Sequence, residues 1–246
     1  MSKMKTIYLV RHAQGEHNIS EISPTGNSFV KDPNLTEFGR SQCKELRESF
    51  LYHDEVQIVM ASPLRRTIQT AVTSFSPVLS RPEVPFLLVP LAQEISAKPC
   101  DVGTDPEKLA AAMDMVLADV DTEFDPTRID FSFLESGWNS KTGLYEASLK
   151  AVELRAAALR RWLWKRPETS IILVTHGAFL PHLTEDWTGL VPPRGTAYQT
   201  TEFRRFTFDE ASTEQDPHLI EIGKTGVKVS RPLGAHAHDI SGVEEV

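Results

Sequence analysis

Short apolar runs that stop abruptly at charged or histidine-bearing turns are the feature that most constrains this chain. The first, Ile7 to Val10, is rich in β-branched and aromatic residues without polar alternation, which is typical of a buried strand. Arg11 and His12 follow it directly. Because ligands of open α/β sheets bind at the carboxyl ends of the strands, the pattern predicts a site at that edge. Taken alone, this turn is equally compatible with two ordinary surface residues.

Three later apolar runs end in the same way. They lead to an arginine pair at a predicted helix start, to an acid and to a second histidine: Val56–Ala61 before Arg65 and Arg66, Val84–Val89 before Glu94, and Ser170–Val174 before His176. Arginine beside a helix N-terminus suits an anion. Successive helical residues point about 100° apart, so at most one of Arg65 and Arg66 faces the site squarely. The alternative interpretation is that both arginines are solvated at the start of the helix and bind no ligand.

The order of these runs predicts an α/β fold, a three-layer α/β/α sandwich with a mostly parallel sheet. Helices are expected from the Thr36 cap to about Tyr52, from Asp105 to about Val120, and over 144–165. Two alternating runs, 200–208 and 218–222, predict an antiparallel edge. We expect a single domain over 1–246, with 94–142 inserted as a cap over the site and 230–246 as a flexible tail.

The composition limits the kinds of partner that the protein is expected to bind. With 40% hydrophobic and 24% charged residues the chain is typical of a soluble globular protein, and its net charge of −8 argues against nucleic acid. No apolar run is long enough to span a bilayer and no signal-like segment precedes Ile7, so we expect no membrane partner and a cytoplasmic location. Cys43 and Cys100 lack metal-ligand spacing and are expected to be reduced. The sequence leaves the oligomeric state open.

The residues at the strand ends resemble the histidine phosphatase superfamily, the phosphoglycerate mutase-like enzymes. The resemblance runs from about Ile7 to Phe179. It rests on blocks similar to the family's Arg-His-Gly signature, helix opening, arginine block and second histidine block: Arg11-His12-Ala13, 35–39, 62–71 and Thr175-His176-Gly177. Within the family, 91–94, 100–103 and 138–143 are similar to a poorly characterised fungal branch. Ala13 replaces the signature glycine, and a positive φ there would strain it.

The resemblance implies a metal-independent phosphatase for a small phosphorylated metabolite, with no cofactor. His12 would attack phosphorus through a neutral ring nitrogen and form a phosphohistidine. Arg11, Arg66 and His176 would surround the phosphate oxygens, replacing the metal ions of many phosphoryl-transfer enzymes. Glu94 would protonate the leaving alkoxide and then activate water.

Five further residues are candidates for substrate binding. The resemblance places a phosphate-contacting amide at Asn18. His17 could touch the substrate, although packing within its loop is the simpler interpretation. Lys98 and Lys141, together with Arg194, could bind a second anionic group, although each is more often a solvated charge.

Three other functions remain open from the sequence. A mutase would retain the phosphohistidine and return the phosphoryl group to the substrate. A non-catalytic module would keep only the anion pocket, an idea supported by Ala13 alone. A recruited enzyme would run a different reaction on a phosphorylated or carboxylated metabolite. The set of His12, Arg66, Glu94 and His176 favours the phosphatase.

Overall fold

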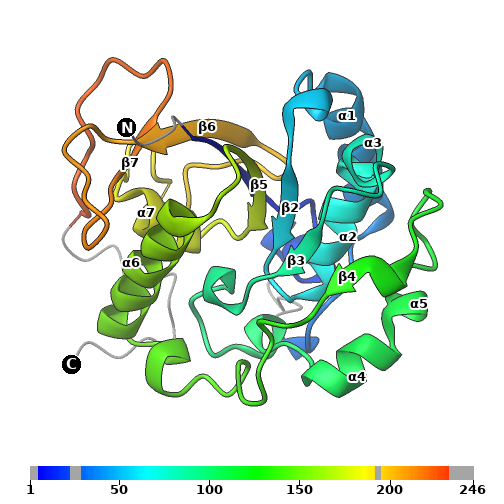
Figure 1. Cartoon of the computed structure of the whole chain (residues 1–246). Coiled ribbons are helices and arrows are strands. Elements are labelled where there is room, and N and C mark those ends of the chain that lie inside the picture. Colours follow the sequence, from blue (N-terminus) through cyan, green and yellow to red (C-terminus); the bar gives the residue numbers. More distant parts are fainter. Residues whose placement is uncertain (1–4, 23–28, 192–194, 233–246) are drawn as a thin grey trace.

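The computed structural model describes residues 5–22, 29–191 and 195–232, and of residues 20–22 only the backbone (Figure 1). In this part of the chain, seven strands form one sheet in the order β4-β3-β2-β5-β1-β6-β7. The strands are β1 (Thr6–Arg11), β2 (Ile58–Ala61), β3 (Phe86–Leu88), β4 (Ile129–Asp130), β5 (Ser170–Thr175), β6 (Phe203–Phe208) and β7 (Leu219–Glu221). The five strands from β4 to β1 are parallel, and β6 and β7 are antiparallel to their neighbours. The predicted sheet with its antiparallel edge is confirmed.

Helices cover both faces of the sheet. The helices are α1 (Glu37–Ser49), α2 (Arg65–Ser74), α3 (Ser76–Leu79), α4 (Pro106–Ala111), α5 (Met113–Val116), α6 (Leu149–Lys165) and α7 (Phe179–Thr184). Helices α1 to α5 lie on one face and α6 and α7 on the other, as predicted for three layers (Figure 1). Along β1, Tyr8 and Val10 enter the first core while Ile7 and Leu9 enter the second. This explains why the strand reads as a continuous apolar run.

The register of the central strands brings three polar turns to one level. Val10 and Ala61 both pair with Val174 of β5, and Arg11 pairs with Thr175. The strand ladder continues for one more residue, because the amide of His12 donates to the Thr175 carbonyl at 3.0 Å and the amide of Ser62 to that of Val174 at 3.0 Å. The turns after β1, β2 and β5 therefore begin side by side.

Helix boundaries differ from the sequence expectations at three places. Thr36 caps α1 as predicted, accepting from the amide of Gly39 at 2.9 Å, but α1 ends at Ser49. The helix expected over 105–120 breaks at Ala112 into α4 and α5. The long helix α6 begins only at Leu149, because Ser148 caps it by accepting from the amide of Ala151. The residues before that cap form the short 3-10 turn η7 (Gly143–Tyr145).

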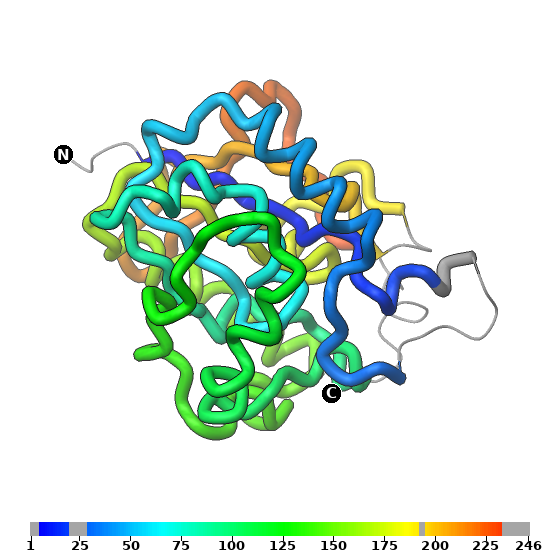
Figure 2. Tube along the Cα trace, turned by 90° about the vertical axis from the view of Figure 1, so that its right-hand side faces the viewer, coloured from blue at the N-terminus to red at the C-terminus, as the bar shows by residue number. Residues whose placement is uncertain are grey.

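Segment 94–142 contributes to the main sheet as well as to its surroundings. The two residues of β4 pair in parallel with β3, an edge strand that the sequence did not predict. Leu109, Met113 and Trp138 belong to the core that Tyr8 and Val10 of β1 enter. In Figure 2, the green stretch that carries α5 faces the viewer, on the same side of the sheet as α1. The single domain with a cap remains a prediction, and most of the predicted tail, including His236 and His238, lies outside the described residues.

None of the helices within the described ranges is both long and apolar enough to cross a membrane.

Candidate active site

His12 lies buried at the end of β1 with one ring nitrogen already engaged. Its Nδ1 is 2.6 Å from the carbonyl oxygen of Ala13, so Nδ1 carries the proton and donates it. This leaves the lone pair on Nε2, to which Nε of Arg66 donates at 3.3 Å. Burial, and after it the positive charge of Arg66, holds the pKa of His12 well below its ordinary value. The imidazole is therefore neutral at pH 7, with Nε2 as a free base.

Ala13 fits its position without strain. Its φ is not positive, since the non-glycine residues with positive φ in the described part of the chain are Asp32, Lys141, Glu185 and Thr201. The amide of Ala13 donates to Oγ1 of Thr70 at 3.1 Å, and the methyl group packs in a small core with Leu35 and Cys43. The strain that a positive φ would impose is absent.

The guanidinium of Arg66 connects the turns of the site. Arg66 is fully buried in the first turn of α2. Besides its Nε contact with His12, its terminal nitrogens donate to the carbonyl of Cys100 at 2.6 Å, to Oδ1 of Asp101 at 2.9 Å and to Nδ1 of His176 at 3.2 Å. Arg65 instead keeps its side chain partly exposed, with Nε 3.8 Å from Asp32. Arg66 is thus the member of the pair that faces the site.

His176 stands opposite His12 in the same neighbourhood. The two ring centroids are 5.2 Å apart. Nδ1 of His176 accepts from Arg66, and Nε2 is 2.8 Å from Oγ of Ser62. A hydroxyl can donate or accept, so Ser62 can serve either tautomer of His176. Burial and the charge of Arg66 hold the pKa of His176 well below its ordinary value.

Arg11 lies against the turn that carries His176. One terminal nitrogen donates to the carbonyl of Tyr198 at 2.7 Å. A Cβ atom on Gly177 would come within 2.9 Å of Nε of Arg11, which explains why this position is glycine. The charge of Arg11 also helps to lower the pKa of His12. The structure therefore brings Arg11, His12, Arg66 and His176 together.

Glu94 reaches the same turn from the loop after β3. Its Oε2 accepts from the amide of Ala178 at 3.3 Å and its Oε1 from the amide of Ile95 at 3.0 Å. Burial, and after it the charge of Asp101, raises the pKa of Glu94 to about 7, although Arg66 and the two amides oppose the rise. Such a carboxyl can both give and take a proton near neutral pH.

The predicted substrate-binding residues differ in what the structure shows of them. Asn18 is engaged locally, its Oδ1 accepting from the amide of Gly15 at 3.0 Å. The ring of His17 lies 5.7 Å from that of His12, and burial and Arg66 lower its pKa to about 3. Nζ of Lys141 donates to the carbonyl of Glu94 at 3.0 Å, and burial lowers its pKa to about 7.

Lys98 is not joined to these groups, because its ammonium forms no hydrogen bond or ion pair with the described residues. Its backbone instead shapes the turn η5 (Pro99–Asp101), where the carbonyl of Lys98 accepts from the amide of Asp101 at 2.8 Å. Arg194 lies outside the described residues.

Three site residues were not predicted from the sequence. Asp101 pairs with Arg66, and Ser62 contacts His176. Arg155 is buried on α6 and donates to the carbonyl of Gln93 at 2.5 Å, which supports the loop that carries Glu94. A charged residue in the midst of an amphipathic helix pattern was the available signal for Arg155. Ser62 directly follows the apolar run before Arg66, so its position relative to the strand was also a signal.

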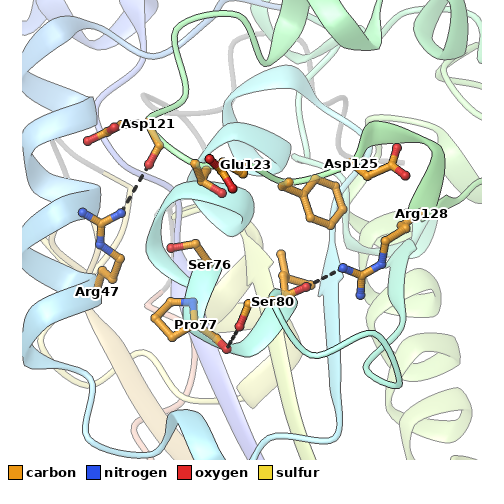
Figure 3. Close-up of a pocket in the computed structure, with 11 residues that line it drawn as sticks. Arg47, Ser76, Pro77, Ser80, Asp121, Glu123, Asp125 and Arg128 are labelled. Atoms are coloured by element: carbon orange, nitrogen blue, oxygen red, sulfur yellow. Dashed lines mark hydrogen bonds between the residues drawn. The ribbon is translucent and has the colours of Figure 1, made fainter.

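A separate hollow of about 660 Å³ lies between α1, α3 and residues 121–128 (Figure 3). The polar groups around this hollow form hydrogen bonds and an ion pair that stabilise the fold. Arg128 donates to the carbonyls of Leu79, Arg81 and Val84, and Asp121 forms an ion pair with Lys44 at 3.0 Å. No histidine lines it. The chemistry therefore belongs to the strand ends rather than to this hollow.

No group of three or more His, Cys, Asp or Glu side chains within the described ranges is arranged to hold a metal ion.

The strand ends thus bring together a neutral buried histidine, two guanidinium groups and a carboxyl whose pKa is raised to about 7. Comparison with known proteins identifies the family of the chain. It belongs to the histidine phosphatase superfamily (branch 1), whose pattern matches residues 7–218. It is accordingly an enzyme, a phosphoric ester hydrolase of the histidine phosphatase type.

Relatives of the chain include proteins from a plant, a fungus and a bacterium. A phosphoglycerate mutase-like protein 1 of Arabidopsis thaliana is 32% identical over 218 residues, which cover 74% of this chain and 71% of that protein. A Schizosaccharomyces pombe protein with the name "Probable phosphatase" is 28% identical over 177 residues, covering 70% and 74%. The solved structure of Bacillus stearothermophilus YhfR has a TM-score of 0.50 at 18% identity, covering 90% of this chain and 98% of that one. The structural likeness supports the α/β fold.

Proposed function

We propose that the protein is a metal-independent phosphatase that hydrolyses a small phosphorylated metabolite through a phosphohistidine on His12. The observation that carries the proposal is the state of His12. Its Nδ1 proton is held by the Ala13 carbonyl, and its Nε2 lone pair lies among Arg66, Arg11 and His176. A neutral nucleophile beside guanidinium groups is the arrangement that attack on a phosphate dianion requires.

The first step forms the bond from Nε2 to phosphorus and breaks the bond from phosphorus to the ester oxygen. The departing alkoxide takes the proton of Glu94. In the second step water attacks the phosphohistidine, its proton passes to Glu94, and His12 is released. Because the pKa of Glu94 is raised to about 7, its acid form is present below that pH and is lost above it. The first step therefore slows as the pH rises above about 7.

The positive side chains compensate the phosphate charge. Arg11 and Arg66 would bind the phosphate oxygens, and Asn18 would offer its amide nitrogen. Once a phosphate oxygen replaces Nδ1 of His176 as a partner of Arg66, donation from Ser62 to Nε2 would let His176 present a proton on Nδ1. Guanidinium groups offer planar sets of donors that match phosphate geometry. Their charge takes the role that metal ions have in other phosphoryl-transfer sites.

Lys141 favours a substrate with a second anionic group. Its ammonium lies beside the carbonyl of Glu94, and its charge lowers the pKa of Asp101 and of His176. A carboxylate on the leaving group would place its charge near this ammonium. His17 and Lys98 are proposed for lesser contacts with the same leaving group.

The test is phosphoenzyme trapping combined with a substrate screen. Wild type, His12→Ala and, as a control, His218→Gln are mixed with phosphorylated metabolites in a buffer that contains a metal chelator. We expect phosphate release by wild type and control, a loss of at least about 10⁴-fold in His12→Ala, and an alkali-stable phosphoryl group on the peptide with His12. His218 is a suitable control because it pairs with Glu185 at 2.7 Å, outside the site.

The same experiment separates the alternatives. Phosphoryl transfer between positions of the substrate, with slow loss to water, would identify a mutase, which the names of the Arabidopsis relatives make the second candidate. Neither phosphate release nor a trapped phosphoenzyme would leave a non-catalytic or recruited member of the family.

A further inference from the structure

Asp101 is a buried carboxylate that the proposed mechanism does not use. It ends the short turn η5, and its side chain is clamped on both oxygens. Oδ1 accepts from Arg66 at 2.9 Å and Oδ2 from the hydroxyl of Ser96 at 2.5 Å. Burial alone would raise the pKa of Asp101, but Arg66, Lys141 and the Ser96 hydrogen bond outweigh it, so the pKa lies below its ordinary value. Asp101 is therefore an anion at neutral pH.

The contacts of η5 determine how Arg66 faces the nucleophile. The carbonyl of Cys100 and the carboxylate of Asp101 take one donor from each terminal nitrogen of the guanidinium. Because the guanidinium is planar, these two contacts fix the direction of the third nitrogen. That nitrogen, Nε, points at Nε2 of His12 from 3.3 Å. A lost contact at Asp101 would let the guanidinium turn within its plane.

We propose that Asp101 is a positioning residue of this site. It orients Arg66 toward His12, and its hydrogen bond with Ser96, two residues beyond Glu94, holds a fixed negative charge against the loop of Glu94 that favours the acid form of this carboxyl. The proposal rests on the phosphatase function proposed above. It gives η5 a role in the proton-transfer step, although Asp101 need not touch the substrate.

Charged groups from three elements and one loop act on Glu94. Asp101 on η5 opposes ionisation of Glu94, whereas Arg66 on α2, Lys141 before η7 and Arg155 on α6 favour it. The amides of Ile95 and Ala178 also favour the ionised form. Arg66, Arg155 and, below about pH 7, Lys141, together with the two amides, would keep an ordinary carboxylate ionised, so the acid form depends on burial and on Asp101. A neutral residue at 101 removes the negative charge that opposes ionisation of Glu94.

The test compares Asp101→Asn with Ser96→Ala. Asparagine has the shape of aspartate and still offers Arg66 an oxygen, but it has no charge. Ser96→Ala removes the other contact of the carboxylate and keeps its charge. The pH dependence of kcat is measured for an alkyl phosphate, whose leaving group needs a proton, and for p-nitrophenyl phosphate, whose leaving group does not.

With the alkyl phosphate we expect the alkaline limb of Asp101→Asn to move down by about one pH unit, while that of Ser96→Ala stays with wild type. With p-nitrophenyl phosphate the limb should not move. A purely structural role would lower kcat equally at every pH, and this result, with Asp101→Asn active, would overturn the inference. A wild-type enzyme without phosphatase activity, or whose alkaline limb survives Glu94→Gln, would instead count against the proposed function.

A measurement on the unmodified protein covers the case in which Asp101→Asn does not fold. Carbon-13 labelling of glutamate carboxyls allows Glu94 to be titrated by NMR, and its resonance is identified by its loss in Glu94→Gln. We expect a midpoint near pH 7. A midpoint at the ordinary glutamate value would show that no neighbouring charge holds the acid form, and it would also overturn the inference.

Discussion

The two walls of the site are built differently. The first wall, His12, Arg66 and His176, stands on β1, α2 and β5, where backbone pairing fixes each turn. The second wall, Glu94, Asp101 and Lys141, stands on loops and a 3-10 turn, which side-chain hydrogen bonds hold in place of a strand ladder. Among these are the bond from Arg155 to the Gln93 carbonyl and that from Lys141 to the Glu94 carbonyl. From this difference we infer that the first wall binds the phosphate, which is common to all substrates, while the second wall contacts the leaving group.

The sharpest way to break this comparison is to vary the leaving group. Glu94→Gln should lower kcat/KM for an alkyl phosphate by about 10²- to 10³-fold, because the alkoxide then leaves without a proton and kcat/KM does not include the later attack of water on the phosphohistidine. For p-nitrophenyl phosphate the loss should be much smaller. Arg66→Lys, in the first wall, should lower kcat/KM by about 10²-fold for both substrates, because it removes donors to the phosphate itself. Equal losses for both substrates in Glu94→Gln would contradict the division.

A smaller effect is expected at Lys141. Lys141→Met should raise KM about tenfold for a phosphate ester with a carboxylate, and leave p-nitrophenyl phosphate unchanged. Because burial lowers the pKa of Lys141 to about 7, its ammonium is charged below that pH and neutral above it. The wild-type preference for the carboxylated substrate should therefore fade as the pH rises through 7.

Lys98→Met gives the matched comparison, because the ammonium of Lys98 forms no hydrogen bond or ion pair with the described residues. Its KM values should stay closer to those of wild type. A pH-independent preference, or a larger change in Lys98→Met than in Lys141→Met, would remove Lys141 from the proposed subsite.

Two glycines allow the rigidity of the walls to be compared directly. A Cβ on Gly39 would lie 2.1 Å from the carbonyl oxygen of Gln14, beside the His12 turn, and a Cβ on Gly103 would lie 2.2 Å from the buried ring of Trp138. Each alanine variant should lose about 1–3 kcal/mol of unfolding free energy, measured by urea denaturation. Gly39→Ala should also lower kcat, because backbone at the nucleophile must move. A kcat loss confined to Gly103→Ala would reverse the comparison.

Much of the first wall could be predicted from the sequence because its signals are local. Apolar runs identify β1 and β5, and Thr36 caps α1 within three residues of its partner Gly39. Helix geometry predicted that at most one of Arg65 and Arg66 faces the site, but it did not say which of the two. The resemblance indicated Arg66, and its complete burial agrees with that choice.

The second wall depended on tertiary structure. Strand β4 has two residues, too few for any periodicity, and it exists only because β3 offers an unpaired edge. Asp101 meets Arg66 across 35 positions of sequence, and Arg155 meets Gln93 across 62. Such pairs follow from the packing of α2, α6 and η5 around the sheet. The sequence by itself determined the apolar strands that carry the site and their polar ends, whose resemblance to a family indicated the kind of chemistry. Only the tertiary structure decided which charges face Glu94, because long-range contacts leave no local pattern.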